Sequence, residues 1–239
     1  HGYSGFSLVR EMKNMISRGV IGKIRVIKAE FAHGHHADEV DADNPRVRWR
    51  YDPAQAGVSA VMADCGIHAL HMACFVSGEE VLEVSADFVS TISSRKLEDD
   101  AMVNFRMTGG IVGRLWSSAI ALGRQHGLTI QVFGESGGLR WAQEQPNQLF
   151  FTELGGRTQI IERGDIRLSL MAQGASRVTI GHSEGMPLAF ANIYVDIAKA
   201  LSSGIHDTGT TLKPIYPNAE DGLRSIAAVH AAQASSLEM

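Results

Sequence analysis

Three ionisable side chains interrupt the most apolar stretch of the sequence. Between residues 59 and 76 nearly every residue is apolar, but Asp64, His68 and His71 are not. At about 100° per residue on an α-helix, these positions fall within roughly 60° of one another. A charge on a helix that is otherwise buried costs several kcal/mol unless it is paired or faces a polar cleft. One interpretation is therefore a cleft that contains a carboxylate and two imidazoles.

Two other interpretations fit the same spacing. Asp64 and His68 could form a simple i,i+4 pair at the helix surface, and spacing alone slightly favours this reading. The residue types also match a metal site with two histidines and one carboxylate, and His33, His35 and His36 offer further ligands. However, Asp64 and His71 are about 10.5 Å apart along a straight helix, too far to converge easily on one ion. We therefore expect no metal site.

Composition narrows the class of protein. The chain has 239 residues, 44% of them hydrophobic, and a formal net charge of −4. These values are typical of a soluble globular protein of one large domain or two small ones. The sequence has no basic run, so we expect no nucleic-acid partner. It also lacks the roughly 18 consecutive apolar residues of a membrane span.

The two cysteines provide an indication of the compartment. Cys65 and Cys74 lie about 13.5 Å apart in helical rise and on opposite faces of the predicted helix, too far for a disulfide. Free thiols fit a reducing environment, so we expect a cytoplasmic protein.

Hydrophobic periodicity predicts the elements that must position these residues. Helices are expected at residues 6–17, 59–76, 188–201 and 218–235, the last with Asn218 as N-cap. Strands are expected at 22–31, 81–90, 100–107, 111–119, 128–133, 138–142, 148–152 and 158–162. Residues 33–57 form a long polar loop, and 163–185 show no clear pattern. Short turns between successive strands indicate antiparallel pairing. The predicted class is α+β, with one large, mostly antiparallel sheet and helices on one face.

Several segments together resemble the C-terminal domain of the glucose–fructose oxidoreductase / inositol dehydrogenase (Gfo/Idh/MocA) family. They occur in the expected order along essentially the whole chain. The segments are MISRGVIGKIRVIKAEF (15–31), WRYDPAQAG (49–57), DCGIHALH (64–71), FVSGEEVLEVSADF (75–88), DDAMVNFRMTGGIVG (99–113), VFGESGGLRW (132–141) and YPNAEDGLRSI (216–226).

The resemblance implies a fold and an activity. It implies a sheet domain like the C-terminal domain of glyceraldehyde-3-phosphate dehydrogenase, preceded in the whole protein by a Rossmann domain. The activity would be the NAD- or NADP-dependent oxidation or reduction of a sugar, polyol or inositol-like substrate. The family pattern assigns the acid/base role to His68, with Asp64 orienting it or the substrate. His71 stands where the family more often has Asp or Asn.

Other positions are expected to contact substrate. Trp49 and Arg50 match the family's Trp-Arg pair, although a structural ion pair of Arg50 is an equal alternative. His71 and His182 are further candidates for substrate contact. Residues 33–36 lie where family members vary, so they are expected either to shape substrate choice or to form a solvated loop.

The cofactor-binding half is expected to be missing. No G-x-G-x-x-G motif occurs between a strand and a helix, and no Glu-Lys-Pro motif is present. We therefore expect residues 1–239 to be one substrate-binding and oligomerisation domain of a two-domain protein. Alone, it should bind no cofactor tightly and show no activity.

A competing hypothesis is a non-catalytic module that uses the same sheet as a binding platform. The family's open sheet face commonly forms a homodimer or homotetramer interface. We expect exposed apolar strand residues to serve that purpose, among them Val103, Phe105, Leu115 and Trp116.

Overall fold

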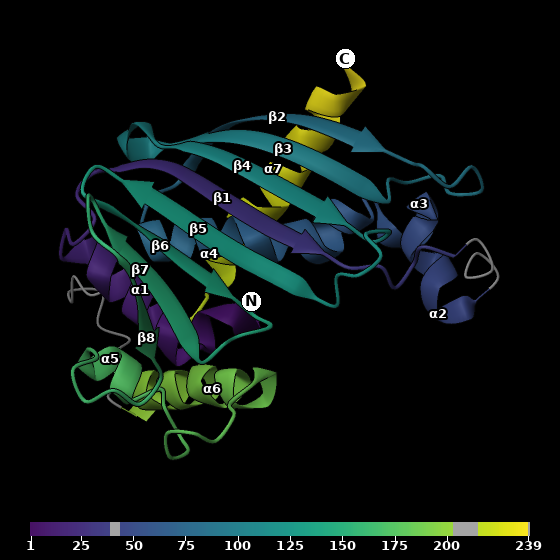
Figure 1. The fold of residues 1–239 in the computed structure, drawn as a ribbon. Helices are drawn as coiled ribbons and strands as arrows, with labels where there is room; N and C mark the ends of the chain where they lie inside the picture. The colour runs from purple at the N-terminus through teal and green to yellow at the C-terminus, as the bar shows by residue number, and fades with distance from the viewer. Residues whose placement is uncertain (39–43, 203–214, 239) are drawn as a thin grey trace.

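The computed structural model describes residues 1–38, 44–202 and 215–238. Its centre is one eight-stranded sheet in the order β2-β3-β4-β1-β5-β6-β7-β8 (Figure 1). All eight predicted strands are therefore confirmed, and they belong to one sheet. The strands are β1 (Ile24–Ala32), β2 (Val81–Val89), β3 (Asp100–Met107), β4 (Val112–Ser118), β5 (Gly127–Gly134), β6 (Gly137–Ala142), β7 (Gln148–Glu153) and β8 (Thr158–Glu162).

The first strand lies in the middle of the sheet. β1 pairs in parallel with β4, where Ala29 lies opposite Leu115, and antiparallel with β5, where Ala29 lies opposite Ile130. The other neighbouring strands are all antiparallel. β1 therefore separates β4 and β5, which follow each other in the sequence. Its end, near residues 31–33, is held in the interior of the sheet.

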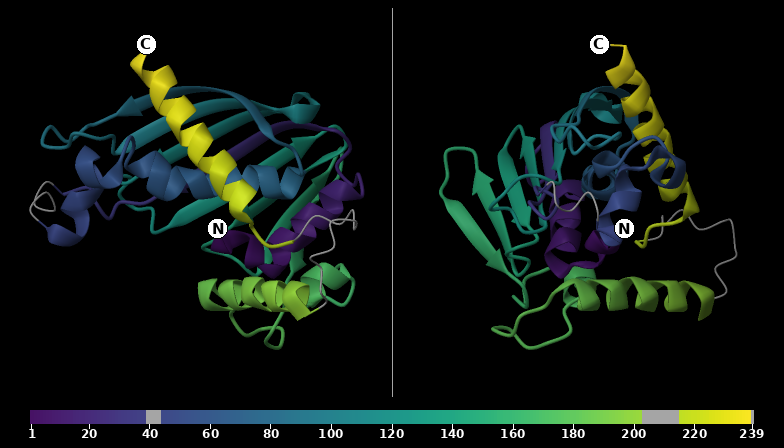
Figure 2. Two further views of the ribbon diagram at one scale, coloured as in Figure 1. Left: turned by 180° about the vertical axis from the view of Figure 1, so that it is seen from behind. Right: turned by 90° about the vertical axis from the view of Figure 1, so that its right-hand side faces the viewer.

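The helices cover one face of this sheet and leave the other face open (Figure 2). α4 packs against β1, α7 packs against β2, and α1 packs against α4 and α5. α6 packs on the N-terminal turn η1 (Gly2–Gly5). The helices are α1 (Ser7–Ser17), α2 (Pro45–Arg48), α3 (Pro53–Ala56), α4 (Ile67–Ser77), α5 (Leu170–Gln173), α6 (Met186–Ser202) and α7 (Ala219–Leu237), with shorter turns η3 (Trp49–Tyr51), η4 (Met62–Gly66) and η5 (Thr108–Gly110).

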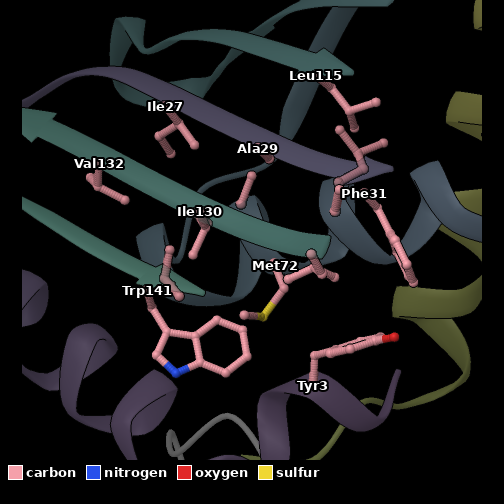
Figure 3. Close-up of a cluster of buried hydrophobic side chains, with 14 of the residues drawn as sticks. Tyr3, Ile27, Ala29, Phe31, Met72, Leu115, Ile130, Val132 and Trp141 are labelled. Atoms are coloured by element: carbon pink, nitrogen blue, oxygen red, sulfur yellow. The ribbon is translucent and has the colours of Figure 1, made fainter. Parts of the chain in front are cut away.

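The core lies between the sheet and its helix layer (Figure 3). Leu128, Ile130 and Val132 alternate along β5 toward the helices, and each is fully buried. Met72 from α4 and Trp141 from β6 fill the space between the layers. The apolar positions of β5 thus line the face of the sheet that the helices cover.

The expectation of exposed apolar residues on β3 and β4 is wrong for three of the four. Val103, Phe105 and Leu115 are each 1% exposed, because their strand positions face the helices. The ring of Phe105 lies across Gly113, where a Cβ would come within 2.0 Å of it. The side chain of Trp116 points to the opposite face of the sheet from Leu115. It therefore lies on the open face, where it donates a hydrogen bond to Asp100.

The predicted loop at residues 33–57 contains regular structure. α2, η3 and α3 occupy most of its second half, while residues 39–43 lie outside the described part. Asn44 and Asp52 begin the two short helices by accepting from the backbone N–H groups of Arg46 and Ala54. Each is followed by proline at the first helical position, so the local sequence does specify these turns.

The C-terminal helix begins as predicted. The Asn218 side chain accepts from the backbone of Asp221, whose carboxylate accepts from the backbone of Asn218. Across the described residues, no helix is both long enough and apolar enough to cross a membrane.

Candidate active site

The helix that carries the predicted catalytic pair is anchored by a buried carboxylate. Glu98, which is 5% exposed, accepts hydrogen bonds from the Ser59 hydroxyl at 2.6 Å and from the backbone N–H groups of Ala60 and Met62 at 3.0 Å. These N–H groups have no partner within the helix, so the carboxylate serves as a cap supplied from the β2–β3 connection. Glu98 thereby fixes where this helix begins.

The turn that holds Asp64 is a π-helix, Met62–Gly66. A Cβ at Gly66 would lie 2.2 Å from the Met62 sulfur, so glycine permits this close approach. A π-turn accommodates an extra residue, and such turns occur frequently at functional sites. The spacing of about 100° per residue in a regular α-helix therefore does not apply across Met62–Gly66. Asp64 is 50% exposed at its side chain and His71 only 6% exposed, so the three ionisable groups do not form one evenly exposed stripe.

Asp64 is held by Arg50, one of the residues predicted to contact substrate. Arg50 Nε donates to Asp64 Oδ2 at 3.1 Å, and Arg50 also donates to the carbonyl of Arg46 at 2.6 Å. The Arg50 guanidinium stacks on the ring of Trp49, 4.6 Å from its centroid. Within the described residues Asp64 Oδ1 makes no hydrogen bond, so one carboxylate oxygen is available to a ligand.

His68 lies in a group of aromatic side chains from the N-terminal turn and α4. Its Nδ1 is 3.3 Å from Nδ1 of His1, and its ring meets Tyr3 edge-on at 5.2 Å. The His1 ring stacks on His71 at 4.0 Å. The rings of Tyr3 and Phe31 meet at 5.7 Å (Figure 3). His68 is therefore packed on several sides and has little freedom to rotate.

A chain of contacts links His68 through His1 to Ser225 on α7. The Ser225 hydroxyl donates to the carbonyl of Asp221 at 2.7 Å, so it can only accept from His1 Nε2, 3.5 Å away. A neutral His1 then has an unprotonated Nδ1, which accepts from Nδ1–H of His68. The remaining nitrogen of His68, Nε2, carries a lone pair.

Burial keeps these imidazoles neutral. The pKa of His68 is lowered to about 4, mainly by desolvation, and Asp64 opposes this lowering. Desolvation is also the main cause that lowers the pKa of His71 to about 3. His71 Nδ1 is buried without a hydrogen-bond partner among the described residues. At neutral pH the site therefore holds one carboxylate and uncharged histidines.

A second group of histidines lies at the end of β1 and in the loop before β5. The rings of His35 and His126 meet at 4.6 Å, and each contacts the buried ring of His33. His33 Nε2 lies 3.5 Å from the Cys65 sulfur, and desolvation lowers the pKa of His33 to about 4. The Asp64 carboxylate opposes the lowering of the pKa of both His33 and His126. Residues 33–36 therefore adjoin the site.

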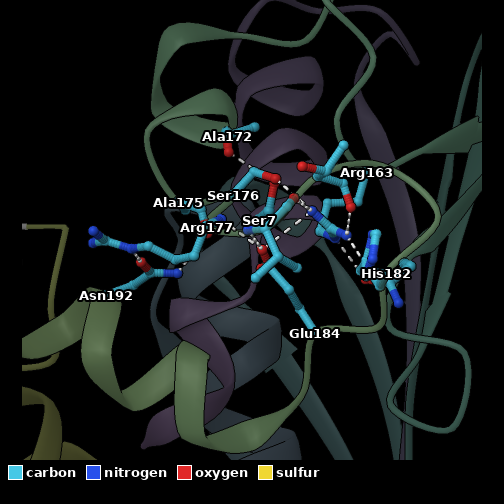
Figure 4. A network of polar contacts seen from close by, with 12 residues as sticks. Ser7, Arg163, Ala172, Ala175, Ser176, Arg177, His182, Glu184 and Asn192 are labelled. Atoms are coloured by element: carbon cyan, nitrogen blue, oxygen red, sulfur yellow. Dashed lines mark hydrogen bonds and ion pairs between the residues drawn. The ribbon is translucent and has the colours of Figure 1, made fainter.

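His182 lies elsewhere. Its side chain is exposed in the connection between β8 and α6, and its backbone carbonyl accepts from the buried guanidinium of Arg163 (Figure 4). None of the described contacts joins it to Asp64 or His68. Its predicted contact with substrate remains a prediction.

Metal binding gains no support from the geometry. Among residues 1–38, 44–202 and 215–238, no group of three His, Cys, Asp or Glu side chains is placed to hold a metal ion. Asp64 pairs with Arg50, whereas His68 and His71 pack against His1. Cys65 and Cys74 are free thiols, and burial raises the pKa of Cys65 to about 12.

The sequence pattern did not reveal His1, Tyr3 or His126. His1 and Tyr3 lie outside any amphipathic segment, in a short turn that packs on α4. His126 precedes β5 in a loop with no motif. Only the central position of β1 brings these segments together, and no spacing rule predicts that.

The fold is an α+β domain whose sheet is covered by helices on one face. Its candidate site places a carboxylate near a neutral imidazole. Together, the fold and the site define the class of protein. The family described as GFO/IDH/MocA C-terminal domain matches residues 9–140. An oxidoreductase of Bacillus subtilis (strain 168), the uncharacterised YfiI, is 33% identical over 230 residues, covering 95% of this chain and 58% of that protein. The chain belongs to the Gfo/Idh/MocA family.

Solved structures of relatives have the same fold as this chain. An inositol dehydrogenase homologue from Azotobacter vinelandii, complexed with NAD+, has a TM-score of 0.91 and 34% identity, covering 99% of this chain and 62% of that chain. The same homologue complexed with NADH and myo-inositol has a TM-score of 0.87 and 32% identity, covering 99% and 61%. This chain thus spans about three fifths of the length of these relatives.

Proposed function

We propose that the protein to which this chain belongs is an NAD- or NADP-dependent dehydrogenase of a sugar, polyol or inositol-like compound. In this proposal residues 1–239 supply the substrate side of the site. The observation that carries it is the closely packed imidazole of His68, whose pKa is lowered by desolvation, near the half-exposed carboxylate of Asp64. The relatives that bind NAD(H) and myo-inositol support the choice of cofactor and substrate class.

The residues fit oxidation of a hydroxyl group. A neutral imidazole can accept the hydroxyl proton, and the nearby carboxylate favours the imidazolium that results. A nicotinamide cofactor, held by the rest of the protein, would supply the hydride acceptor that converts this hydroxyl group to a carbonyl group. Asp64 Oδ1 can accept a hydrogen bond from a neighbouring hydroxyl, while Arg50 holds Oδ2. In the reverse direction His68 returns the proton.

The arrangement also favours neutral substrates. The fixed charge of Asp64 would repel a carboxylate or phosphate group, and the surrounding histidines are uncharged at neutral pH. Trp49 is 41% exposed beside Arg50 and offers an apolar face against which a sugar ring can pack.

The test uses the full-length protein. NADH and NADPH formation should be measured with a panel of inositols, hexoses and linear polyols. At least one neutral polyol should give turnover that depends on His68, whereas turnover only with acidic or phosphorylated compounds would contradict the proposal. Calorimetry with residues 1–239 alone should show no NAD or NADP binding, and micromolar affinity would contradict the division of roles.

A homodimer or homotetramer formed through the open sheet face is proposed as well. Met102 and Phe133 are nearly half-exposed on that face, and Arg140 stacks on Phe150 at 4.2 Å there. Exposed aromatic, Met and Arg side chains are enriched at protein interfaces. In analytical ultracentrifugation, Phe133→Glu should dissociate the assembly, whereas Leu122→Glu, in an exposed loop, should not. A monomeric wild type would exclude the interface.

A further inference from the structure

A crevice with basic walls lies between the turns around Tyr51 and the connection from β2 to β3. Its volume is about 340 Å³. Arg48 lines it from one segment and Lys96 from the other, and both residues are exposed. Neither forms an ion pair with another described residue. Ser94, two residues before Lys96, adds an exposed hydroxyl group that can donate to an oxygen. An anion between the two walls would be attracted to both cations.

The buried guanidinium of Arg95 lines the same crevice. Arg95 is 7% exposed, and it donates to Asp99 Oδ2 at 3.1 Å and to the backbone carbonyl of His36. Its guanidinium lies over the ring of Tyr51, 4.2 Å from the centroid. Arg95 Nε is buried and has no hydrogen-bond partner among the described residues. These contacts fix the guanidinium in place, yet they leave part of its donor capacity unused beside the crevice.

One acidic residue, Asp52, is among the described residues that line the crevice. Both of its carboxylate oxygens already accept hydrogen bonds, one from the backbone N–H of Ala54 at 3.1 Å and the other from Gln55 Nε2 at 2.7 Å. The pKa of Asp52 is lowered, chiefly by the hydrogen bond from Gln55, and the charges of Lys96 and Arg48 also lower it. The charge of Asp52 is therefore partly offset by the same two cations, so it opposes an anion only weakly.

The two segments that line the crevice also hold the candidate active site. Tyr51 directly follows Arg50, whose Nε lies 3.1 Å from Asp64 Oδ2. On the other wall, Lys96 lies two residues before Glu98, which caps the helix that carries Asp64. Asp64 itself does not line the crevice, so an occupant there is distinct from the oxidised substrate. An occupant that bridges the walls would tie together the two segments that position Asp64.

We propose that this crevice is a second ligand site, which binds the phosphate group of a small molecule between Arg48 on one wall and Lys96 on the other. With Arg95 paired to Asp99, two cations outweigh the single carboxylate of Asp52 in the described lining. A phosphate group carries a charge of about −1.5 to −2 at pH 7 and presents three acceptor oxygens, which suits two cations on opposite walls. The inference goes beyond the proposed oxidation of a neutral polyol, because it assigns a separate site to an anion.

The test is calorimetry of inorganic phosphate with the full-length protein at constant ionic strength. The wild type should bind phosphate with a Kd in the millimolar range or below. The double variant Arg48→Gln, Lys96→Gln should weaken this binding about tenfold or more, because both charged donors are lost. The double variant Arg18→Gln, Arg157→Gln removes the same charge at exposed positions elsewhere and should bind as the wild type does. Phosphate should also raise the Tm of the wild type and of this control, but not of the first variant.

Three results would overturn the site. They are no phosphate binding by the wild type, binding that the substitutions at Arg48 and Lys96 leave unchanged, and an equal loss in the charge-matched control. If the double variant does not fold, Lys96→Gln alone, at an exposed position, decides the same question. Glycerol 3-phosphate distinguishes the two sources of the group, since tighter binding than phosphate indicates a phosphate ester as the occupant and weaker binding indicates free phosphate.

Discussion

Two polar clusters in this domain satisfy their hydrogen-bonding groups to different degrees. Arg163 is 4% exposed, and its guanidinium donates to the side chains of Asn147, Ser176 and Glu184 and to three backbone carbonyls (Figure 4). Glu184 in turn accepts from two backbone N–H groups. At the candidate site, by contrast, Asp64 Oδ1, His71 Nδ1 and the ring nitrogens of His35 and His126 make no hydrogen bond to another described residue.

This difference distinguishes polar groups that hold the structure together from polar groups that are available to bind a ligand. A buried charge with every group paired holds a segment in place, here the connection between β8 and α6. Unpaired groups, a π-turn and the positive φ of His126 each have an energetic cost, which the rest of the fold must offset. Their concentration around Asp64 is what distinguishes the candidate site from the cluster around Arg163.

The largest expected effect is at His68. In the full-length enzyme, His68→Ala should lower kcat by about 10²–10⁴-fold, because the hydroxyl proton loses its acceptor. Steady-state kinetics measures this, with His230→Ala, at an exposed position on α7, as the control. If kcat stays unchanged, His68 is not the acid/base and the contrast between the clusters loses its functional meaning.

Removing the centre of the other cluster should affect stability instead. Arg163→Met should lower the free energy of unfolding by about 3–5 kcal/mol, because Glu184 is left as a buried, unpaired charge. Urea denaturation measures this. Arg167→Met, whose side chain is 86% exposed, should cause no measurable loss. Equal stability of the two variants would show that the cluster around Arg163 does not hold the fold.

Acid should destabilise the site more than the other cluster. The folded pKa of His71 is about 3, below the value near 6.5 of an unfolded histidine. The unfolded chain therefore binds the proton more readily, and stability falls as the pH drops from about 6.5 toward 3. We expect a loss of roughly 2–4 kcal/mol, measured by urea denaturation at several pH values. His71→Asn should flatten this dependence and His230→Asn should not, so equal slopes would rule out His71 as its source.

A smaller effect is expected at the cap of the helix that carries Asp64 and His68. Glu98→Gln should lower the free energy of unfolding by about 1–2 kcal/mol, because the three hydrogen bonds that Glu98 Oε1 accepts would go to a neutral amide oxygen instead of a charged carboxylate oxygen. Thermal unfolding measures this, against Glu153→Gln at an exposed position. A shift no larger than that of the control would mean that the carboxylate is not needed as a cap.

The smallest effect tests the hydrogen-bond chain behind His68. Ser225→Ala removes the acceptor of His1, so both tautomers of His1 and His68 become accessible. We expect kcat to fall by about threefold to tenfold with little change in KM, and Ser225→Thr to restore it. The ¹⁵N chemical shifts of His68 should report the altered tautomer, and unaltered shifts would contradict the chain.

The sequence specified the local structure well, for reasons that act over short distances. Strand alternation, the Asn218 capping box and the turn signals depend on neighbouring residues, so the eight strands and the last helix were predictable. Which residues of β3 and β4 face the helices was not predictable. An alternating pattern shows that the two faces of a strand differ, but not which face a helix will cover. The apolar stretch at residues 59–76 gave the positions of Asp64 and His68, but not the π-turn between them.

By itself, then, the sequence determined the α+β class, the family and the pair Asp64 and His68 as candidates. Only the tertiary structure decided what surrounds that pair. The insertion of β1 between β4 and β5 brings His33 and His35 to the loop of His126, and the N-terminal turn carries His1 to His68. These contacts join residues far apart in the chain. Long-range pairing and packing fix them, and no local pattern encodes such pairing.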